Sequence, residues 1–158
     1  MSKPHGATAL RTLATDWFTA AGNWWQRWYG DSHTALGRRG ERAAVRYLKA
    51  RGYRIVARGR RAGFVEIDIV AVDGRTVVFV EVKTRRSDQA GEPAEAVDPQ
   101  RQQRMTRAAL AFLKFHDLME CAARFDVVAV HWPEGSRRPE IQHIENAFEA
   151  AGVDGMFS

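Results

Sequence analysis

The sequence contains a single cysteine, Cys121, among its 158 residues. One cysteine excludes an internal disulfide framework and any cysteine-based zinc site. Such sparing use of cysteine is typical of a reducing compartment, so we expect a cytoplasmic protein. The chain also lacks an uninterrupted apolar run long enough to cross a bilayer, and no compact apolar run follows a basic start. We therefore expect neither a membrane span nor a signal peptide.

Charge of one sign is scarce in two stretches of the chain. Between Arg38 and Arg61 there are ten basic residues and a single acid, Glu41, whereas the stretch from Pro139 onward has four acids and no lysine or arginine. The net charge is +5 at pH 7. A concentrated basic region favours a polyanionic partner, most simply nucleic acid. The alternative is that the arginine-rich segments are only solvated faces.

Residues 1–33 look separable from the rest. Apolar residues recur there at alternating spacings of four and three, which predicts an amphipathic helix of roughly five turns. The recurring residues are Leu10, Ala14, Trp17, Ala21, Trp24 and Trp28. A tryptophan-rich helix can bind a partner protein or a membrane surface, or it can cover the core of the main domain. We expect residues 1–33 to be an extension and residues 34–158 a main domain, with its motifs at about 35–130.

The pattern of apolar, capping and turn residues in the main domain predicts an α/β fold, with elements in the order helix, strand, hairpin, helix, strand, strand. The first helix, 35–51, ends at Gly52, a favourable C-terminal residue. The second starts at Asp98-Pro99, a capping side chain followed by proline at the first helical position. Strands are expected at 53–57, 64–83 (the hairpin), 124–130 and 140–144, with a helical turn from Ala147.

The hairpin carries an unusual number of charged residues. A two-residue turn at Asp73-Gly74 places Glu66 opposite Glu81, whereas a register two residues away places Asp68 opposite Glu81. In either register four charged residues share one face, namely Glu66, Asp68, Glu81 and Lys83. Carboxylates crowded on a strand pair repel one another, and nothing in β-propensity favours them.

A divalent cation such as Mg²⁺ would relieve this repulsion. Asp68 and Glu81 can supply two oxygen ligands, and the backbone carbonyl of Val82 a third. The ammonium of Lys83 can orient a water molecule and stabilise charge on a phosphate. Phosphodiester hydrolysis needs these parts. The alternative is a cross-strand ion pair of Glu66 with Lys83, which leaves Asp68 and Glu81 unexplained.

Glu41 lies on the predicted buried stripe of the first helix, beside Gly37 and Gly40. The glycines leave room for close backbone approach. A buried acid is costly unless it is paired or bound to metal. Glu41 therefore either assists the metal site or forms an ion pair with Arg124 or another buried arginine.

Five separated motifs occur in order along residues 35–130. They are Gly37-Arg38-Arg39-Gly40-Glu41, Glu66-Ile67-Asp68, Phe79-Val80-Glu81-Val82-Lys83-Thr84-Arg85, Gly91-Glu92-Pro93 and Arg124-Phe125-Asp126-Val127-Val128. In these motifs the chain resembles the YraN family, which is regarded as restriction-endonuclease-like and similar to archaeal Holliday-junction resolvases. Residues 1–33 lie outside the resemblance.

The resemblance implies a restriction-endonuclease-like mixed sheet flanked by helices. It also implies a nuclease signature of Asp68, Glu81 and Lys83, with Glu41 as the first-helix acid and Glu66 as the partner of Asp68. At three positions the chain departs from the usual family residue, namely Gly59, Val65 and Arg101. Arg101 stands where the family often has lysine, which keeps the charge but not the point-like ammonium.

These observations predict a nuclease that depends on Mg²⁺ or Mn²⁺ and acts on DNA, with branched or processed structures as candidate substrates and RNA left open. Seven arginines are expected to contact phosphates, namely Arg58, Arg60, Arg61, Arg85, Arg86, Arg101 and Arg104. Two alternatives stay open. One is a non-catalytic nucleic-acid-binding module, and the other is an adaptor recruited through the tryptophan-rich helix. The resemblance to junction resolvases also suggests a homodimer.

Overall fold

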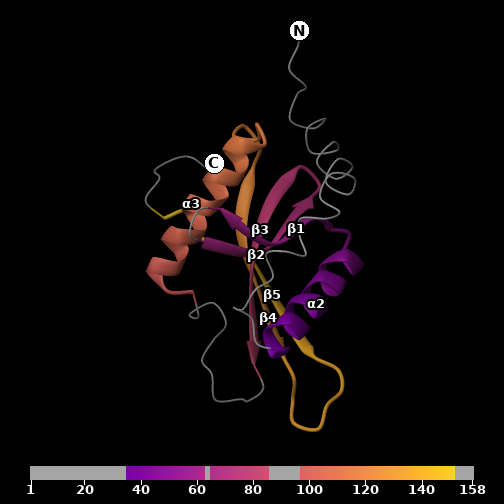
Figure 1. Cartoon of the computed structure of the whole chain (residues 1–158). Coiled ribbons are helices and arrows are strands. Elements are labelled where there is room, and N and C mark those ends of the chain that lie inside the picture. The colour runs from indigo at the N-terminus through magenta and orange to yellow at the C-terminus, as the bar shows by residue number, and fades with distance from the viewer. Residues whose placement is uncertain (1–34, 63–64, 86–96, 152–158) are drawn as a thin grey trace.

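The computed structural model describes residues 35–62, 65–85 and 97–151, and for residues 60–62, 65 and 66 it describes the backbone alone (Figure 1). The predicted amphipathic helix in residues 1–33 and the proposed domain boundary lie outside the described residues. In the described part of the chain, no helix is long and apolar enough to cross a membrane.

In the described residues, five strands form one mixed sheet in the order β1-β2-β3-β4-β5. The elements are α2 (Ala35–Ala50), β1 (Arg54–Ala62), β2 (Val65–Asp73), β3 (Thr76–Arg85), α3 (Pro99–Phe115), β4 (Ala123–His131) and β5 (Glu140–Phe148). Strands β1, β2 and β3 are antiparallel neighbours, β3 and β4 are parallel, and β4 and β5 are antiparallel. A parallel pair needs a crossover connection, which α3 supplies. The predicted α/β class and the order of the elements are confirmed.

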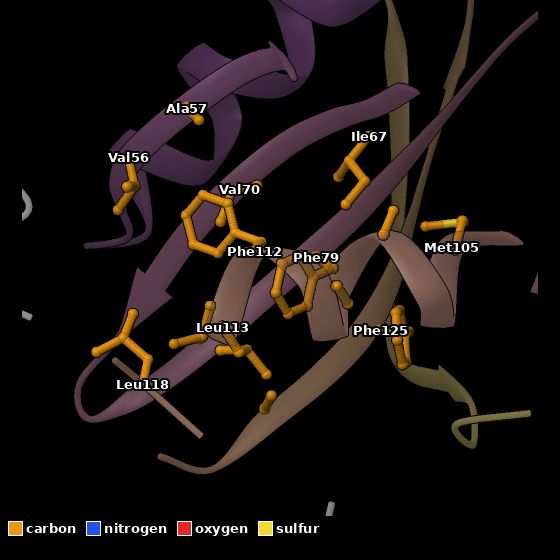
Figure 2. Packing of buried hydrophobic residues seen from close by; sticks show 14 of the residues in the cluster. Val56, Ala57, Ile67, Val70, Phe79, Met105, Phe112, Leu113, Leu118 and Phe125 are labelled. Atoms are coloured by element: carbon orange, nitrogen blue, oxygen red, sulfur yellow. The ribbon is translucent and has the colours of Figure 1, made fainter. Parts of the chain in front are cut away.

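Helices α2 and α3 cover opposite faces of the sheet (Figure 1). Helix α2 buries Ala44 and Leu48 against one face, where Val78 and Val128 lie. Helix α3 covers the other face through the predicted stripe of Met105, Ala108, Ala109, Phe112 and Leu113, all buried (Figure 2). The ring of Phe112 meets that of Phe79 edge-on, with 5.8 Å between centroids. Burial of apolar area on both faces holds the sheet between the helices.

Local signals in the sequence explain where the helices begin and end. The Asp98 side chain accepts a hydrogen bond of 2.9 Å from the Arg101 amide, and Pro99 follows at the start of α3. After α2, Gly52 adopts a φ of 90°, the left-handed conformation that glycine tolerates. Both boundaries agree with the sequence prediction.

Strands β1 and β5 extend furthest beyond their expected ends. Strand β1 continues to Ala62, with an irregularity between Ile55 and Ala57 that re-aligns it on β2. Strand β5 continues to Phe148, so the helical turn expected from Ala147 is wrong. Phe148 pairs with Phe125 of β4, and their rings stack with centroids 4.8 Å apart. This long-range contact keeps the segment extended.

The hairpin adopts the second of the two predicted registers. Asp73 pairs with Thr76 across the turn, and Ile69 pairs with Val80 at the other end of the ladder. Asp68 and Glu81 are the next residues along each strand. The register therefore places these two acids together just beyond the paired part of the hairpin.

Candidate active site

Three carboxylates from separate elements face one hollow of about 230 Å³. Glu41 comes from α2, Asp68 from β2 and Glu81 from β3, and they are only 7%, 6% and 3% exposed. Five further residues line the hollow, namely Leu36, Gly37, Val82, Thr84 and Arg101. Buried acids are rare unless they are paired or bind a cation, so this hollow is the candidate site.

Asp68 sits where the ladder between β2 and β3 ends. Its Oδ2 accepts a hydrogen bond of 2.7 Å from the Val82 amide, so a side chain bonds to a backbone donor of β3. Burial raises the pKa of Asp68 to about 7, with further upward contributions from the charges of Glu81 and Glu41. The Val82 hydrogen bond and the charge of Arg101 act in the opposite direction. Burial and the two neighbouring acids therefore favour the protonated form of Asp68 in the metal-free protein.

Glu81 is bound by two cations. Lys83 Nζ lies 3.1 Å from Oε1 of Glu81. Arg101 donates from Nη2 and Nε to the other oxygen, Oε2, at 2.7 and 3.3 Å. Lys83 and Glu81 are two residues apart on β3, so both project from the same side of the strand. The predicted proximity of Glu81 and Lys83 is thus present in the structure.

Glu41 reaches the hollow because α2 approaches β3 closely. A Cβ atom on Gly40 would overlap the side chain of Thr84 on β3, so only glycine permits this approach. The alternative partner expected for Glu41, Arg124, makes its ion pairs with Asp73, Asp126 and Glu145. Helix α2 thereby presents Glu41 to the same hollow as Asp68.

Of the other predicted site residues, some line the hollow, some lie elsewhere on the described surface, and the side chains of the rest are not described. Val82 lines the hollow and donates its amide to Asp68. The backbone of Glu66 pairs with that of Arg61, but the side chain of Glu66 is not described. Among the seven arginines, Arg58 and Arg85 are half-buried, Arg104 is exposed and Arg101 lines the hollow, whereas the side chains of Arg60, Arg61 and Arg86 are not described.

Sequence reasoning missed several features of the site. Thr84 and Leu36 line the hollow without having been singled out, and the contact of Arg101 with Glu81 was not foreseen. No short-range signal marks that contact, because the two residues are 20 positions apart. A basic stripe on the exposed face of α2 was also missed, although its spacing of four, four and three is visible. Its residues are Arg38, Arg42, Arg46 and Lys49.

Carboxylate oxygens at this density are the donors that Mg²⁺ and Mn²⁺ prefer. A cation would offset the charges of Glu81 and Glu41, which add to the effect of burial on the pKa of Asp68. In the described residues, however, no group of three acidic, histidine or cysteine side chains is arranged to hold a metal ion together. Glu81 is instead bound by Lys83 and Arg101. The donor chemistry fits a divalent cation, and loading would require Glu81 to change partners.

Fold and site together define a class: a small α/β protein with a mixed five-stranded sheet and a buried acidic hollow at the point where β2 and β3 part. The chain belongs to the uncharacterised protein family UPF0102, whose family model matches residues 40–130. The predicted YraN-like resemblance is thereby confirmed.

The similarity to individual relatives covers most of each chain. A UPF0102 protein of Rhodopirellula baltica is 42% identical over 157 residues, which cover 93% of both chains. Relatives from Geotalea uraniireducens and Syntrophus aciditrophicus are 49% and 50% identical and cover 74% and 73% of this chain, and 91% and 89% of their own. The Rhodopirellula match leaves so little uncovered that it extends into residues 1–33.

Proposed function

We propose that this protein is a nuclease of the restriction-endonuclease-like class that hydrolyses phosphodiester bonds in DNA with Mg²⁺ or Mn²⁺. The observation that carries the proposal is the convergence of Glu41, Asp68 and Glu81 from three elements on one hollow, with Lys83 bound to Glu81. Branched or processed DNA is the candidate substrate. A cytoplasmic location and a homodimeric state belong to the same proposal.

Each residue has a distinct role in this mechanism. Asp68 and Glu81 would hold the cation, with Glu41 and the Val82 carbonyl assisting. When bound, the cation supplies Lewis-acid activation of water and of the phosphoryl oxygen. Lys83, which lies beside Glu81, orients the attacking water and stabilises the negative charge that develops on the phosphate. Glu66 remains a candidate secondary acid of the site.

The basic surface supports nucleic acid as the partner. The exposed stripe Arg38, Arg42, Arg46 and Lys49 runs along α2, the helix that also supplies Glu41 and Gly37 to the hollow. Cations in such a stripe bind phosphates without reading sequence. Of the seven arginines predicted from the sequence, Arg104 is exposed and Arg58 and Arg85 are half-buried. We therefore expect affinity for DNA to fall steeply with salt.

One observation favours a second candidate, a non-catalytic nucleic-acid-binding module with the same fold. Both oxygens of Glu81 are bound by side chains of the protein, and the described residues contain no ready-made set of three metal ligands. Such a module would bind DNA without cleaving it and without any requirement for a divalent ion. Attachment to a partner protein or membrane surface through residues 1–33 is compatible with either candidate.

The experiment that separates the two candidates is a cleavage assay on a panel of linear, flapped and four-way DNA substrates with Mg²⁺ or Mn²⁺. We expect cleavage by the wild-type protein and unchanged DNA binding by the variants. Lys83→Ala should lose at least about 100-fold in rate, the contribution of a positioned acid–base group, and Asp68→Ala should lose at least as much because it removes a ligand of the cation. Lys114→Ala, an exposed lysine near the end of α3, is the matched control. Cleavage that persists in chelator or in both site variants would reject the nuclease proposal.

A further inference from the structure

Arg101 provides a positive charge beside Glu81, one of the three buried acids of the hollow. It lies in the first turn of α3, and its guanidinium donates two hydrogen bonds to Oε2 of Glu81, from Nη2 at 2.7 Å and from Nε at 3.3 Å. The Glu81 side chain is 5% exposed and that of Arg101 is 22% exposed. Lys83 takes the other oxygen of Glu81 at 3.1 Å. The two oxygens of a nearly buried carboxylate are thus both engaged.

We propose that Arg101 is an exchangeable internal counter-ion: it holds Glu81 when the hollow contains no metal, and a divalent cation displaces it. This inference rests on the proposed function and adds how the site is loaded. The displaced guanidinium remains at the rim of the hollow, where its planar fork can bind a phosphate of the substrate. Arg101 is therefore a positioning residue for Glu81 before loading and a phosphate contact afterwards.

The formal charges of the hollow support an exchange over simple addition. Once all three acids are ionised, as cation binding requires, Glu41, Asp68 and Glu81 carry three negative charges, and Arg101 and Lys83, the two cations described on Glu81, carry two positive ones. Adding a divalent cation while Arg101 stays would make this cluster positive. If Arg101 leaves Glu81 and pairs with a phosphate, the remaining three carboxylates, Lys83 and the cation balance to neutrality.

Chemistry and space also favour movement of Arg101. A guanidinium does not lose its proton in a protein, so Arg101 can release Glu81 only by moving away. The hollow of about 230 Å³ that Arg101 lines gives its side chain room to do so. Lys83, two residues from Glu81 on the same strand, can stay in place and keep Glu81 oriented.

The test is the affinity of metal-free protein for Mn²⁺, measured by calorimetry without DNA. Arg101→Gln removes the competing charge, so we expect Mn²⁺ to bind about tenfold more tightly than in the wild type, given the strength of a charged hydrogen bond. Arg101→Lys should lie between the two. Arg107→Gln, an exposed arginine on the same helix that does not line the hollow, is the matched control and should equal the wild type.

A second measurement uses the wild-type protein, so it does not depend on the folding of a variant. The Nε–H resonance of Arg101, assigned by its loss in Arg101→Gln, should shift when Mg²⁺ is added, and the shift should be absent in Asp68→Asn. Unchanged or weaker Mn²⁺ binding by Arg101→Gln, together with a resonance that ignores Mg²⁺, overturns the exchange. If Asp68→Asn still weakens Mn²⁺ binding in that case, the proposed nuclease site survives. If no protein binds Mn²⁺ at all, both proposals fall.

Discussion

The carboxyl group of Asp68 is buried beside two other acids, Glu81 and Glu41. The stability of the metal-free protein therefore depends on pH. Burial, followed by the charge of Glu81, raises the pKa of Asp68 from 3.8 to about 7. Between these two values the folded protein keeps the proton of Asp68 while the unfolded chain has lost it. The free energy of unfolding therefore falls as the pH rises from about 4 to about 7. Above pH 7, Asp68 is ionised in both the folded and the unfolded state, so it causes no further change in stability.

Asp68→Asn should remove this penalty. At pH 8 in chelator, we expect the variant to be more stable than the wild type by on the order of 2 kcal/mol, because each pKa unit is worth about 1.4 kcal/mol and neighbouring groups share the effect. The gain should shrink toward zero near pH 4, as measured by urea unfolding across the pH range. Asp117→Asn, at an exposed turn position, is the control. A gain that does not vary with pH would contradict the assignment.

At the scale of elements, the contact between α2 and β3 decides whether Glu41 reaches the hollow. Glycine in a helix normally costs about 1 kcal/mol relative to alanine, so Gly40 is unfavourable for α2 by itself. Its value lies in packing, because a Cβ atom would overlap the Thr84 side chain on β3. The close approach of α2 therefore compensates for the loss of helix propensity.

Gly40→Ala should consequently destabilise the protein instead of stabilising it. We expect a loss of about 1–3 kcal/mol, the usual cost of overpacking, measured by urea unfolding. Thr84→Ala removes two of the three side-chain atoms that the new Cβ would meet, so the double variant should recover part of the loss. Stabilisation by Gly40→Ala alone would show that the contact is not tight.

At the scale of the whole molecule, a buried polar network ties the far strands to the start of β1. Asp126 on β4 is fully buried and accepts hydrogen bonds from Arg124 at 3.0 Å, from His143 on β5 at 2.8 Å and from the Asn146 amide at 3.0 Å. Arg124 also donates to the hydroxyl of Tyr53, just before β1. The network joins segments that are distant in sequence and lies apart from the acidic hollow.

Burial raises the pKa of the Asp126 carboxyl, but the hydrogen bonds from His143, Arg124 and Asn146 outweigh it, so that the pKa lies below the usual value. The ionised carboxylate stabilises the fold above the unfolded pKa of about 4, and this contribution is lost as the pH falls through the folded pKa. We expect Asp126→Asn to cost about 3 kcal/mol at pH 7, since it leaves Arg124 poorly paired, and less in acid, as measured by chemical unfolding.

Glu145→Gln provides the control for Asp126. Glu145 lies 4.0 Å from Arg124 and is exposed, so its loss should change stability by less than about 1 kcal/mol. An equal cost for the two substitutions would mean that the network contributes through general electrostatics and not through the buried pair.

The sequence was sufficient for the features that depend on neighbouring residues. Asp98-Pro99 and Gly52 set helix boundaries through local hydrogen bonding and backbone conformation, and both were predicted. Alternation of apolar and charged residues identified the strands of the hairpin and placed Asp68, Glu81 and Lys83 on one side of it. The periodicity of apolar residues and the capping of helices depend on residues close together in the sequence, so both can be predicted from the sequence alone.

Tertiary structure decided what depends on distant segments. The pairing of β2 with β3 shows which of the two hairpin registers forms. Long-range packing kept β5 extended to Phe148 and brought Glu41 to the hollow through the fit of Gly40 against Thr84. The pairing of Arg101 with Glu81 joins a helix to a strand across the crossover, and no spacing rule encodes it. The sequence alone thus predicts that Asp68 and Glu81 lie on one face of the hairpin. The pairing of Glu81 with Arg101 is determined only when α3 packs against the sheet.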